Sequence, residues 1–439
     1  MSVATRSIAE TFVTIVGREG VRADDEARAA AAVDGQPPRW VVCPVSIDQL
    51  SRVVALAHDE GLAVVPRGGG HALELGNPPT RVDVVADLSS LVRVVEYNPD
   101  DLTITAEAGI SAGALAALLA PHRQFLPLDP PGLISRTLGG VTATNASGPL
   151  RARYGTMRDL LLGVRFVQAD GVVTWGGSKV VKSVSGYDVP KLMVGALGTL
   201  GVLGELTLRL HPRPDVEGSW LVLLPSTQAA QGLVERIVDS PLQPNRIEFF
   251  NDRALESLPV ETAVAGVAVS IGSVVEAVRE QGERLVTMAK AAGARTVPLP
   301  DEFWSVADRA LTAERHESAL QVAVVAGRLA DTERAITEAV RTAAPGAQVR
   351  ISGCAAVGTF RVLVGGASVA EAAAMVTRVR AWATELGGSV VVASGPAELR
   401  KAVDPWGPID PGPFALMRAL RDEFDPKRVL NPGRYVGGL

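Results

Sequence analysis

Three consecutive glycines between an arginine and a histidine make PRGGGH (66–71) the stretch best suited to hold an anion. The apolar run LAVV (62–65) precedes it and predicts a buried strand that ends at the glycines. Successive glycine N–H groups can converge on a phosphate, and Arg67 adds a positive charge. Neither G-x-G-x-x-G nor G-K-[ST] is present here. A pyrophosphate site and a ligand-free glycine hairpin both remain open from this loop alone.

Two further glycine clusters favour the ligand. DPPGLISRTLGGVTATNASGPLRARYG (129–155) combines glycine pairs with short hydroxyl and amide side chains in a predicted loop. LMVGALGTLGVLGE (192–205) places glycines where a turn and a strand can lie against a flat ligand. Three such surfaces within one region predict a single long cofactor that several loops cross.

The elements around these loops indicate an α+β chain. SIDQL (46–50) has capping-box spacing and predicts a helix start, and FVQADGVVTW (166–175) predicts a hairpin at Asp170-Gly171. After the linker candidate HPRPDVEGS (211–219), strands and helices alternate regularly. A core-facing helix is expected at 273–293, with Val274 and Val278 on its buried face. The Pro/Gly-rich tail FDPKRVLNPGRY (424–435) is expected to return to the first domain.

Composition narrows the classes of partner. With 439 residues and a net charge of −5, the chain lacks the basic surface that nucleic acids require. The cysteines Cys43 and Cys354 have neither metal-ligand nor disulfide spacing, so we expect no metal site and a cytoplasmic location. The apolar run at 112–120 is far shorter than a membrane span, so no membrane insertion is expected.

Four motifs in one order carry a family resemblance. PRGGGH, TLGGVTATNASGPLRARYG, VVKSVSGYDVPKLMVGALGTLGVLGELTLRLHP and FDPKRVLNPGR resemble the FAD-linked oxidase family that includes vanillyl-alcohol oxidase. Within it, the chain is most similar to the FAD-binding subunits of bacterial glycolate oxidases, whose pattern includes AVDPWGP (402–408). The resemblance is strong over 22–213, good over 385–439 and weaker between them.

The resemblance implies a fold and a division into domains. It implies an α+β protein with a two-subdomain FAD-binding domain of the PCMH type and an α+β cap domain. A helical lead-in would occupy 1–35, the FAD-binding domain 36–213, the cap or substrate domain 214–398, and a C-terminal return to the FAD domain 399–439.

The resemblance also assigns residues to FAD. The first loop, with Arg67, Gly68, Gly69 and Gly70, would wrap the pyrophosphate. The residues expected along the dinucleotide and the flavin ring are Asp129, Thr137, Gly139, Gly140, Thr144, Asn145, Gly148, Tyr154, Gly155, Gly201, Val202 and Asn431. His71 either hydrogen-bonds the loop or a phosphate, or bonds covalently to the flavin as the histidine of similar loops does.

No catalytic base stands out in the sequence. Larger relatives carry H-x-G-D-G-N-x-H in the second domain, and this chain has no such motif; His316 is the sole histidine of that domain. Arg361, Arg151 and Arg153 are weak candidates for binding a carboxylate, and Tyr154 for touching substrate or flavin.

The family implies an FAD-dependent oxidoreductase, and three roles within that class stay open. The first is the FAD-binding subunit of a glycolate oxidase-type 2-hydroxy acid dehydrogenase, with hydride transfer from the substrate α-carbon to flavin N5. Its partners would be a small 2-hydroxy acid, a second FAD subunit and an iron–sulfur subunit. The second is a non-catalytic flavin-binding or electron-transfer subunit. The third is a stand-alone oxidase of alcohols or sugars with covalent FAD on His71.

Overall fold

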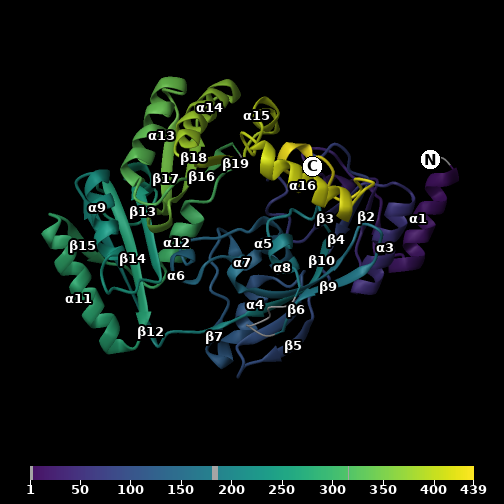
Figure 1. The fold of residues 1–439 in the computed structure, drawn as a ribbon, viewed down its shortest axis with the longest axis horizontal. Coiled ribbons are helices and arrows are strands. Elements are labelled where there is room, and N and C mark those ends of the chain that lie inside the picture. The colour runs from purple at the N-terminus through teal and green to yellow at the C-terminus, as the bar shows by residue number, and fades with distance from the viewer. Residues whose placement is uncertain (1–2, 180–185, 315) are drawn as a thin grey trace.

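The computed structural model describes residues 3–179, 186–314 and 316–439. Residues 180–185, which open the third family motif, lie outside the described residues. Within the described chain, no helix is long and apolar enough to cross a bilayer. Figure 1 shows an N-terminal half and a separate domain built on a broad sheet, with the C-terminal helix lying over the N-terminal half.

The first sheet presents the strand that leads to the glycine loop. Its strands run in the order β1-β2-β4-β3, and β3 ends at Arg67. Helix α3 buries Ile47, Leu50 and Val53 beneath it, and the Ser46 hydroxyl accepts a hydrogen bond from the Gln49 N–H, as the capping pattern predicts. The elements are α1 (Val3–Val16), β1 (Val21–Arg22), α2 (Asp25–Ala30), β2 (Trp40–Val42), α3 (Ile47–Asp59), β3 (Val64–Arg67) and β4 (Val84–Asp87).

A five-stranded antiparallel sheet, in the order β5-β6-β10-β8-β9, completes the N-terminal half. The hairpin between β8 and β9 turns at Gly171 with φ 89°, which confirms the predicted turn. The strands of this sheet are β5 (Val94–Asn98), β6 (Thr103–Glu107), β8 (Leu161–Val167), β9 (Val173–Gly177) and β10 (Val202–Arg209), while β7 (Gln124–Phe125) and β11 (His211–Pro212) form a separate two-stranded sheet. The helices are α4 (Ala112–Leu119), η1 (Ala120–His122), η2 (Leu133–Ser135), α5 (Leu138–Thr144), α6 (Arg151–Tyr154), α7 (Met157–Leu160) and α8 (Val189–Met193).

Helix α5 corrects one sequence expectation. The stretch 129–155 was expected to be a loop, but 138–144 form a helix capped by the Thr137 hydroxyl, which accepts from the Gly140 N–H at 3.2 Å. Glycine disfavours helices in isolation, so the pattern gave no helix signal. Tertiary packing reverses that preference, because a Cβ at Gly139 would lie 2.8 Å from the Ala108 Cβ.

The cap domain is an eight-stranded antiparallel sheet in the order β15-β12-β14-β13-β17-β18-β16-β19. Its strands are β12 (Val216–Leu224), β13 (Arg246–Asn251), β14 (Ala265–Ser273), β15 (Arg295–Pro298), β16 (Ser318–Ala323), β17 (Gln348–Cys354), β18 (Thr359–Gly365) and β19 (Ser389–Ser394). Its helices are α9 (Thr227–Val238), α10 (Asp252–Glu256), α11 (Val275–Ala291), α12 (Phe303–Ala310), α13 (Leu329–Ala343), η3 (Ala355–Val357), α14 (Val369–Glu385) and α15 (Ala397–Ala402).

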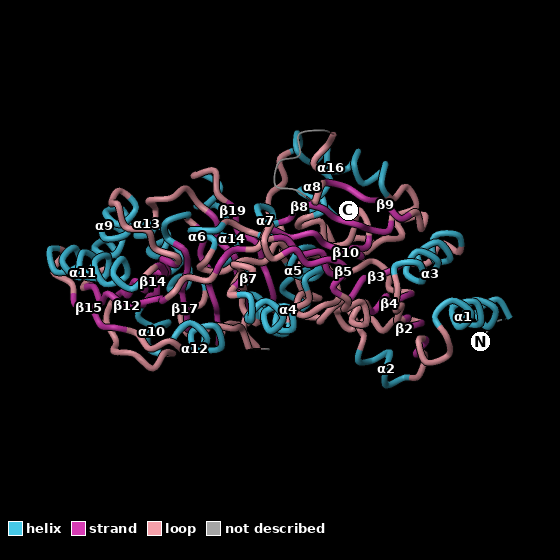
Figure 2. The backbone as a smooth tube through the Cα atoms, turned by 90° about the horizontal axis from the view of Figure 1, so that it is seen from below, coloured by secondary structure: helices cyan, strands magenta, loops and turns pink. Residues whose placement is uncertain are grey.

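The two faces of the cap sheet differ in character. Alternate residues such as Ile247, Phe249 and Ile351 point into a large apolar core that α9, α11, α13 and α14 cover. On the other face, α10 and α12 cover one end with a smaller apolar cluster, and Figure 2 shows them opposite α9 and α13. Val274 corrects an expectation, since it caps α11 and is 49% exposed, whereas Val278 is buried as predicted.

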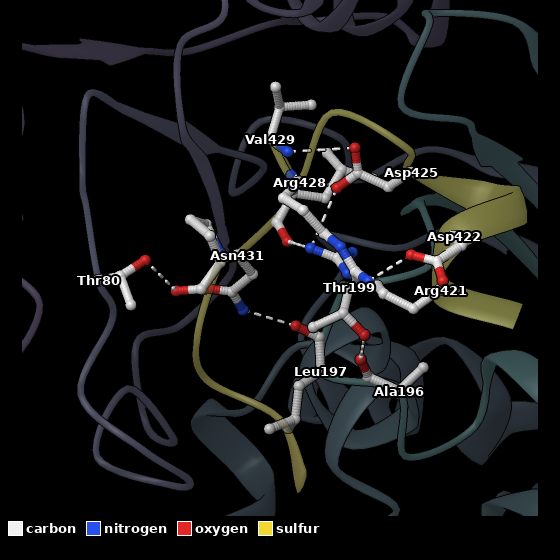
Figure 3. Close-up of polar contacts among 12 residues, drawn as sticks. Thr80, Ala196, Leu197, Thr199, Arg421, Asp422, Asp425, Arg428, Val429 and Asn431 are labelled. Atoms are coloured by element: carbon white, nitrogen blue, oxygen red, sulfur yellow. Dashed lines mark hydrogen bonds and ion pairs between the residues drawn. The ribbon is translucent and has the colours of Figure 1, made fainter. Parts of the chain in front are cut away.

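The tail folds back onto the first sheet. After α16 (Pro411–Phe424), Leu430 forms a parallel bridge to Val64, and the chain ends in η4 (Val436–Gly438). The buried Asp425 carboxylate pairs with Arg421 at 3.0 Å and accepts from the N–H groups of Val429 and Leu430 (Figure 3). These bonds fix the turn that brings the last ten residues beside the glycine loop.

Candidate cofactor and substrate site

A cleft opens where β3 ends, between the glycine loop, the start of α5 and the C-terminal return. Gly70 takes φ 76°, a conformation that favours glycine. Nine residues predicted to bind the cofactor line this one cleft: Arg67, Gly68, Gly69, Gly70, His71, Thr137, Gly140, Thr144 and Asn431. The structure therefore brings three segments together that are far apart in sequence.

The first two glycines lie too close to neighbouring protein atoms for either position to carry a side chain. A Cβ at Gly69 would lie 2.7 Å from the His71 Nδ1 and 2.9 Å from the Ser135 carbonyl oxygen. A Cβ at Gly68 would overlap the Thr137 hydroxyl. The loop can thus approach a ligand with bare backbone, as a pyrophosphate requires.

Four buried polar atoms in and beside the cleft have no hydrogen-bond partner among the described residues. They are the Arg67 Nε, the Asn145 Oδ1, the Asn431 Oδ1 and the Arg434 Nε. Leaving buried polar groups without a hydrogen-bond partner costs free energy of folding. A polar ligand that hydrogen-bonds to them would therefore be bound more tightly. The two guanidinium donors suit phosphate oxygens, and the amide oxygens can accept from a flavin or ribose donor. The residues present therefore fit FAD.

Asn431 shows how the return shapes the cleft. It adopts φ 47°, donates its backbone N–H to the Val64 carbonyl at 2.8 Å, and donates its Nδ2 to the Leu197 carbonyl at 2.6 Å (Figure 3). Leu197 is itself in the left-handed region, at φ 51°. The backbone N–H and the side-chain Nδ2 of Asn431 both donate to protein carbonyls. Its Oδ1 has no partner among the described residues and is therefore left for a ligand.

Arg434 lines the same cleft and was not predicted from sequence. Its Nη2 donates to the carbonyls of Leu73 (2.5 Å) and Leu75 (2.8 Å). Burial lowers the pKa of the Arg434 guanidinium to about 10, so it remains a cation at neutral pH. With Arg67 and Arg136, it makes the cleft positively charged.

His71 is exposed, and its Nε2 lies 2.9 Å from the Ser135 hydroxyl. Burial of the ring and then the Arg136 charge lower the pKa of His71, which favours the neutral imidazole. The hydrogen bond engages Nε2 and leaves Nδ1 on the other side of the ring. Both the hydrogen-bonding role and the covalent tether stay predictions.

The other predicted cofactor residues do not line the cleft, and their contact with FAD stays a prediction. Gly139 packs on Ala108, and Gly148 abuts the Asp129 backbone. Gly201 packs against Phe166, while Val202 begins β10 within the core. Gly155 turns the chain at φ 78° beside Asp159, and Asn145 ends α5 at φ 48°.

Tyr154 and Asp129 lie at the boundary between the FAD-binding half and the cap. The Tyr154 ring packs edge-on against Phe125 and His211, and burial raises the pKa of its hydroxyl. The Asp129 carboxylate accepts from the Leu150 N–H at 2.9 Å and pairs with the Arg246 Nε of β13 at 2.9 Å.

The face of the cap sheet turned toward this boundary carries polar side chains, which we call the inner face: Arg246, Glu248, Arg350, Ser352, Cys354 and Arg361. Helix α6 packs against β13 at this face. Three carboxylates near it already accept hydrogen bonds or pair with arginines. Asp129 has Arg246, Glu317 pairs with Arg350 at 2.6 Å, and Asp308 accepts from the Gly132 N–H at 3.0 Å.

Arg361, a weak sequence candidate, occupies the middle of the inner face. It lies directly opposite Ser352 in the register of β17 and β18. The described residues offer it no hydrogen bond or ion pair. Burial and the nearby Arg136 lower the pKa of Arg361 to about 10, while Asp308 and Glu248 act in the opposite direction. Its guanidinium is a charged, unpaired donor between the domains.

Glu248, which the sequence analysis missed, lies on β13 beside Arg361 and Ser352. It is 8% exposed, and burial raises the pKa of its carboxyl well above the usual range, followed by the Asp129 charge. The signal was present in RIEFF (246–250), where Arg246 and Glu248 alternate with core residues. Charged residues at alternate positions of an otherwise apolar strand indicate a polar face.

Comparison with known proteins agrees with this geometry. The pattern described as "FAD binding domain" matches residues 38–177, and "FAD linked oxidases, C-terminal domain" matches 213–435. The chain is 26% identical to glycolate oxidase subunit GlcD of Bacillus subtilis (strain 168), covering 98% of this chain and 97% of that protein. It is 27% identical to D-2-hydroxyglutarate dehydrogenase of Xanthomonas citri pv. viticola, covering 90% and 89%.

Among solved structures, p-cresol methylhydroxylase with bound substrate is similar in fold. The two superimpose with a TM-score of 0.76 at 14% identity, covering 99% of this chain and 97% of that one. At this identity the similarity is evidence for the fold alone. It confirms the predicted PCMH-type α+β fold.

Proposed function

The chain belongs to the FAD-linked oxidases and is an FAD-dependent oxidoreductase, and we propose that it is the FAD-binding subunit of a glycolate oxidase-type dehydrogenase. Its substrate would be a small 2-hydroxy acid, since the relatives of similar length are named for glycolate and D-2-hydroxyglutarate. The observation that carries the proposal is the unpaired Arg361 guanidinium on the inner face, whose charge interacts with that of Arg136 in the cofactor cleft.

The chain's own residues would hold FAD through the cleft. Gly68 and Gly69 would admit the pyrophosphate, with Arg67 and Arg434 compensating its charge. The Asn431 amide oxygen would accept a hydrogen bond from the cofactor. Bound FAD supplies a two-electron acceptor, so that hydride can pass from the substrate α-carbon to flavin N5.

Arg361 would bind the substrate carboxylate. A guanidinium presents paired donors that match a carboxylate, and such charge-assisted bonds are stronger than neutral ones. The neighbouring Arg136 supplies a second positive charge from the FAD-binding half. A carboxylate held between the two domains would place its α-carbon at the boundary where the cofactor cleft ends.

The test compares Arg361→Ala with Arg341→Ala, an exposed arginine of α13. The purified proteins are given glycolate, D-lactate and D-2-hydroxyglutarate with an artificial electron acceptor, and 2-oxo acid is measured. We expect Arg361→Ala to lose about 100-fold or more in kcat/KM, in line with a lost charged hydrogen bond of 2–3 kcal/mol, and Arg341→Ala to match the wild type. An active wild type that tolerates Arg361→Ala would overturn the carboxylate assignment.

The subunit role has a separate test. We propose that a second FAD subunit and an iron–sulfur subunit receive the electrons in the cytoplasm. Purification of the tagged chain from its own cells should then yield a complex that contains iron. A catalytically active monomer without bound partners would favour a stand-alone enzyme, and a yellow protein that no 2-hydroxy acid reduces would favour an electron-transfer subunit.

A further inference from the structure

We propose that Glu248 is the general base of the reaction and takes the proton from the substrate hydroxyl. This inference rests on the proposed oxidation of a 2-hydroxy acid. Glu248 stands on β13, and Arg361 stands on β18 with only β17 between them. A substrate whose carboxylate binds Arg361 would therefore present its neighbouring hydroxyl toward Glu248.

The strand register supports this placement. Phe250 pairs with Ser352, and Ser352 pairs with Arg361, so these three form one row across the sheet. Glu248 lies two residues along β13 from Phe250 and therefore on the same face. Ser352, in the same row as Arg361, lies near enough to the Glu248 carboxyl to favour its charged form.

Other groups at this boundary are less suited to accept the proton. Asp129 and Glu317 are each paired with an arginine, and Asp308 already accepts from the Gly132 N–H. Burial and then Glu248 raise the pKa of the Cys354 thiol to about 12, so it stays protonated. The Tyr154 hydroxyl likewise has a raised pKa and acts as an acid rather than a base.

Glu248 lacks an ion-pair partner within the part of the chain that the structure describes. The charged and titratable groups around it are Asp129, Arg151 of α6, Cys354 of β17 and Arg361 of β18. Burial and Asp129 favour the protonated carboxyl, whereas Arg361 and Arg151 favour the carboxylate. A raised pKa makes the Glu248 carboxylate a stronger proton acceptor than an ordinary carboxylate, as a general base requires.

The proposed step balances. The substrate hydroxyl loses its proton to a carboxylate oxygen of Glu248, and the α-carbon loses its hydrogen with the bonding electron pair to FAD. The C–O bond becomes the C=O bond of a 2-oxo acid. Bound FAD would supply the acceptor for the two electrons that the substrate loses, and Glu248 would end protonated.

The first test follows reduction of the bound FAD by the best 2-hydroxy acid under anaerobic conditions across a pH series. Glu248→Gln should slow reduction by about 100-fold or more, as loss of a general base does, and remove the acidic limb of the pH profile. Glu248→Asp should keep that limb at a lower rate. Glu256→Gln, an exposed glutamate of α10, serves as the matched control and should match the wild type.

The second test does not depend on turnover. Oxalate, an unreactive dicarboxylate, is added to the FAD-loaded protein in weak buffer, and proton uptake is measured. An anion bound at Arg361 should draw a proton onto Glu248 because two nearby negative charges disfavour each other, and Glu248→Gln should abolish the uptake.

The outcomes separate the two proposals. A wild type that no 2-hydroxy acid reduces would overturn the proposed function and this inference with it. An active wild type whose Glu248→Gln variant is reduced within threefold of the normal rate, or still takes up the proton, would overturn the Glu248 assignment alone.

Discussion

The cofactor cleft and the inner face of the cap sheet are built in opposite ways. The cleft depends on backbone, since its glycines pack where a side chain would clash and left-handed turns such as Asn431 bring the chain close to the ligand site. The inner face is made of side chains on regular strands, each set by its alternation and its register. We therefore expect the cleft to lose FAD binding when a side chain is enlarged there. The inner face should lose activity or stability when a charged side chain is removed from it.

The largest effect is expected from adding atoms to the cleft. Gly69→Val should abolish FAD retention, because its Cβ alone would lie 2.7 Å from His71 and 2.9 Å from the Ser135 carbonyl. The cap domain should stay folded because this loop is outside its core. The measurement is the flavin content of the purified protein, with Gly346→Ala as control, where a Cβ meets nothing within 4 Å. A fully yellow Gly69→Val protein would refute this placement of the pyrophosphate.

Removing a charge at the boundary should have a moderate effect. Asp129→Ala leaves the Leu150 N–H and the Arg246 Nε without their acceptor, although Arg246 keeps Glu217 at 2.5 Å. We expect a loss of about 2 kcal/mol in the free energy of unfolding, as for a buried hydrogen-bonded charge. Urea unfolding measures it, and the exposed Asp239→Ala serves as the control. Equal stability of the two variants would mean that the ion pair contributes nothing.

Glu248 should give a smaller, pH-dependent effect on stability. Because its folded-state pKa is raised, its contribution to stability is fully present below the unfolded pKa, about 4.3, and is lost as the pH rises through the folded pKa. The wild type should therefore lose melting temperature with rising pH relative to Glu248→Gln. In a protein of 439 residues, a difference of about 1 °C corresponds to each kcal/mol, because the entropy of unfolding scales with chain length. Parallel melting curves at every pH would contradict the burial of an unpaired Glu248.

The smallest effect is expected at His71. The ring is exposed, and its Nε2 bonds to Ser135 rather than to a buried group. We expect His71→Ala to keep its FAD, with its affinity for FAD weakened by about tenfold or less, which is the contribution of one hydrogen bond. Acid precipitation of the wild type should release the flavin into the supernatant. Yellow colour that stays with the precipitate, and is absent from His71→Ala, would establish the covalent tether instead.

Local patterns predicted local structure well. The Ser46 cap and the Asp170-Gly171 turn depend on neighbours in sequence, and both are present. The glycine loop at the end of β3 was predicted for the same reason. In contrast, helix α5 was missed because its glycines are tolerated only by packing on Ala108, which no local pattern records.

The inner face could be predicted only in part. Arg361 was a weak candidate, and Glu248 was absent from the candidates, although RIEFF carried an alternation of charge. Their proximity depends on the pairing of β13, β17 and β18, which joins segments about 100 residues apart. Such register is set by the whole sheet rather than by any one strand. Arg434 was also missed, because the return and Asn431 were predicted but no pattern in LNPGR showed that the Arg434 side chain would reach the Leu73 carbonyl.

The most direct test of the central claim is the visible spectrum of the purified, FAD-loaded protein under anaerobic conditions as glycolate, D-lactate and D-2-hydroxyglutarate are added in turn. Our account predicts that one of them bleaches the flavin band and yields one equivalent of 2-oxo acid for each FAD reduced. A spectrum that stays yellow with all three, in a protein that a chemical reductant does bleach, would contradict the assignment of this chain as the site of 2-hydroxy acid oxidation.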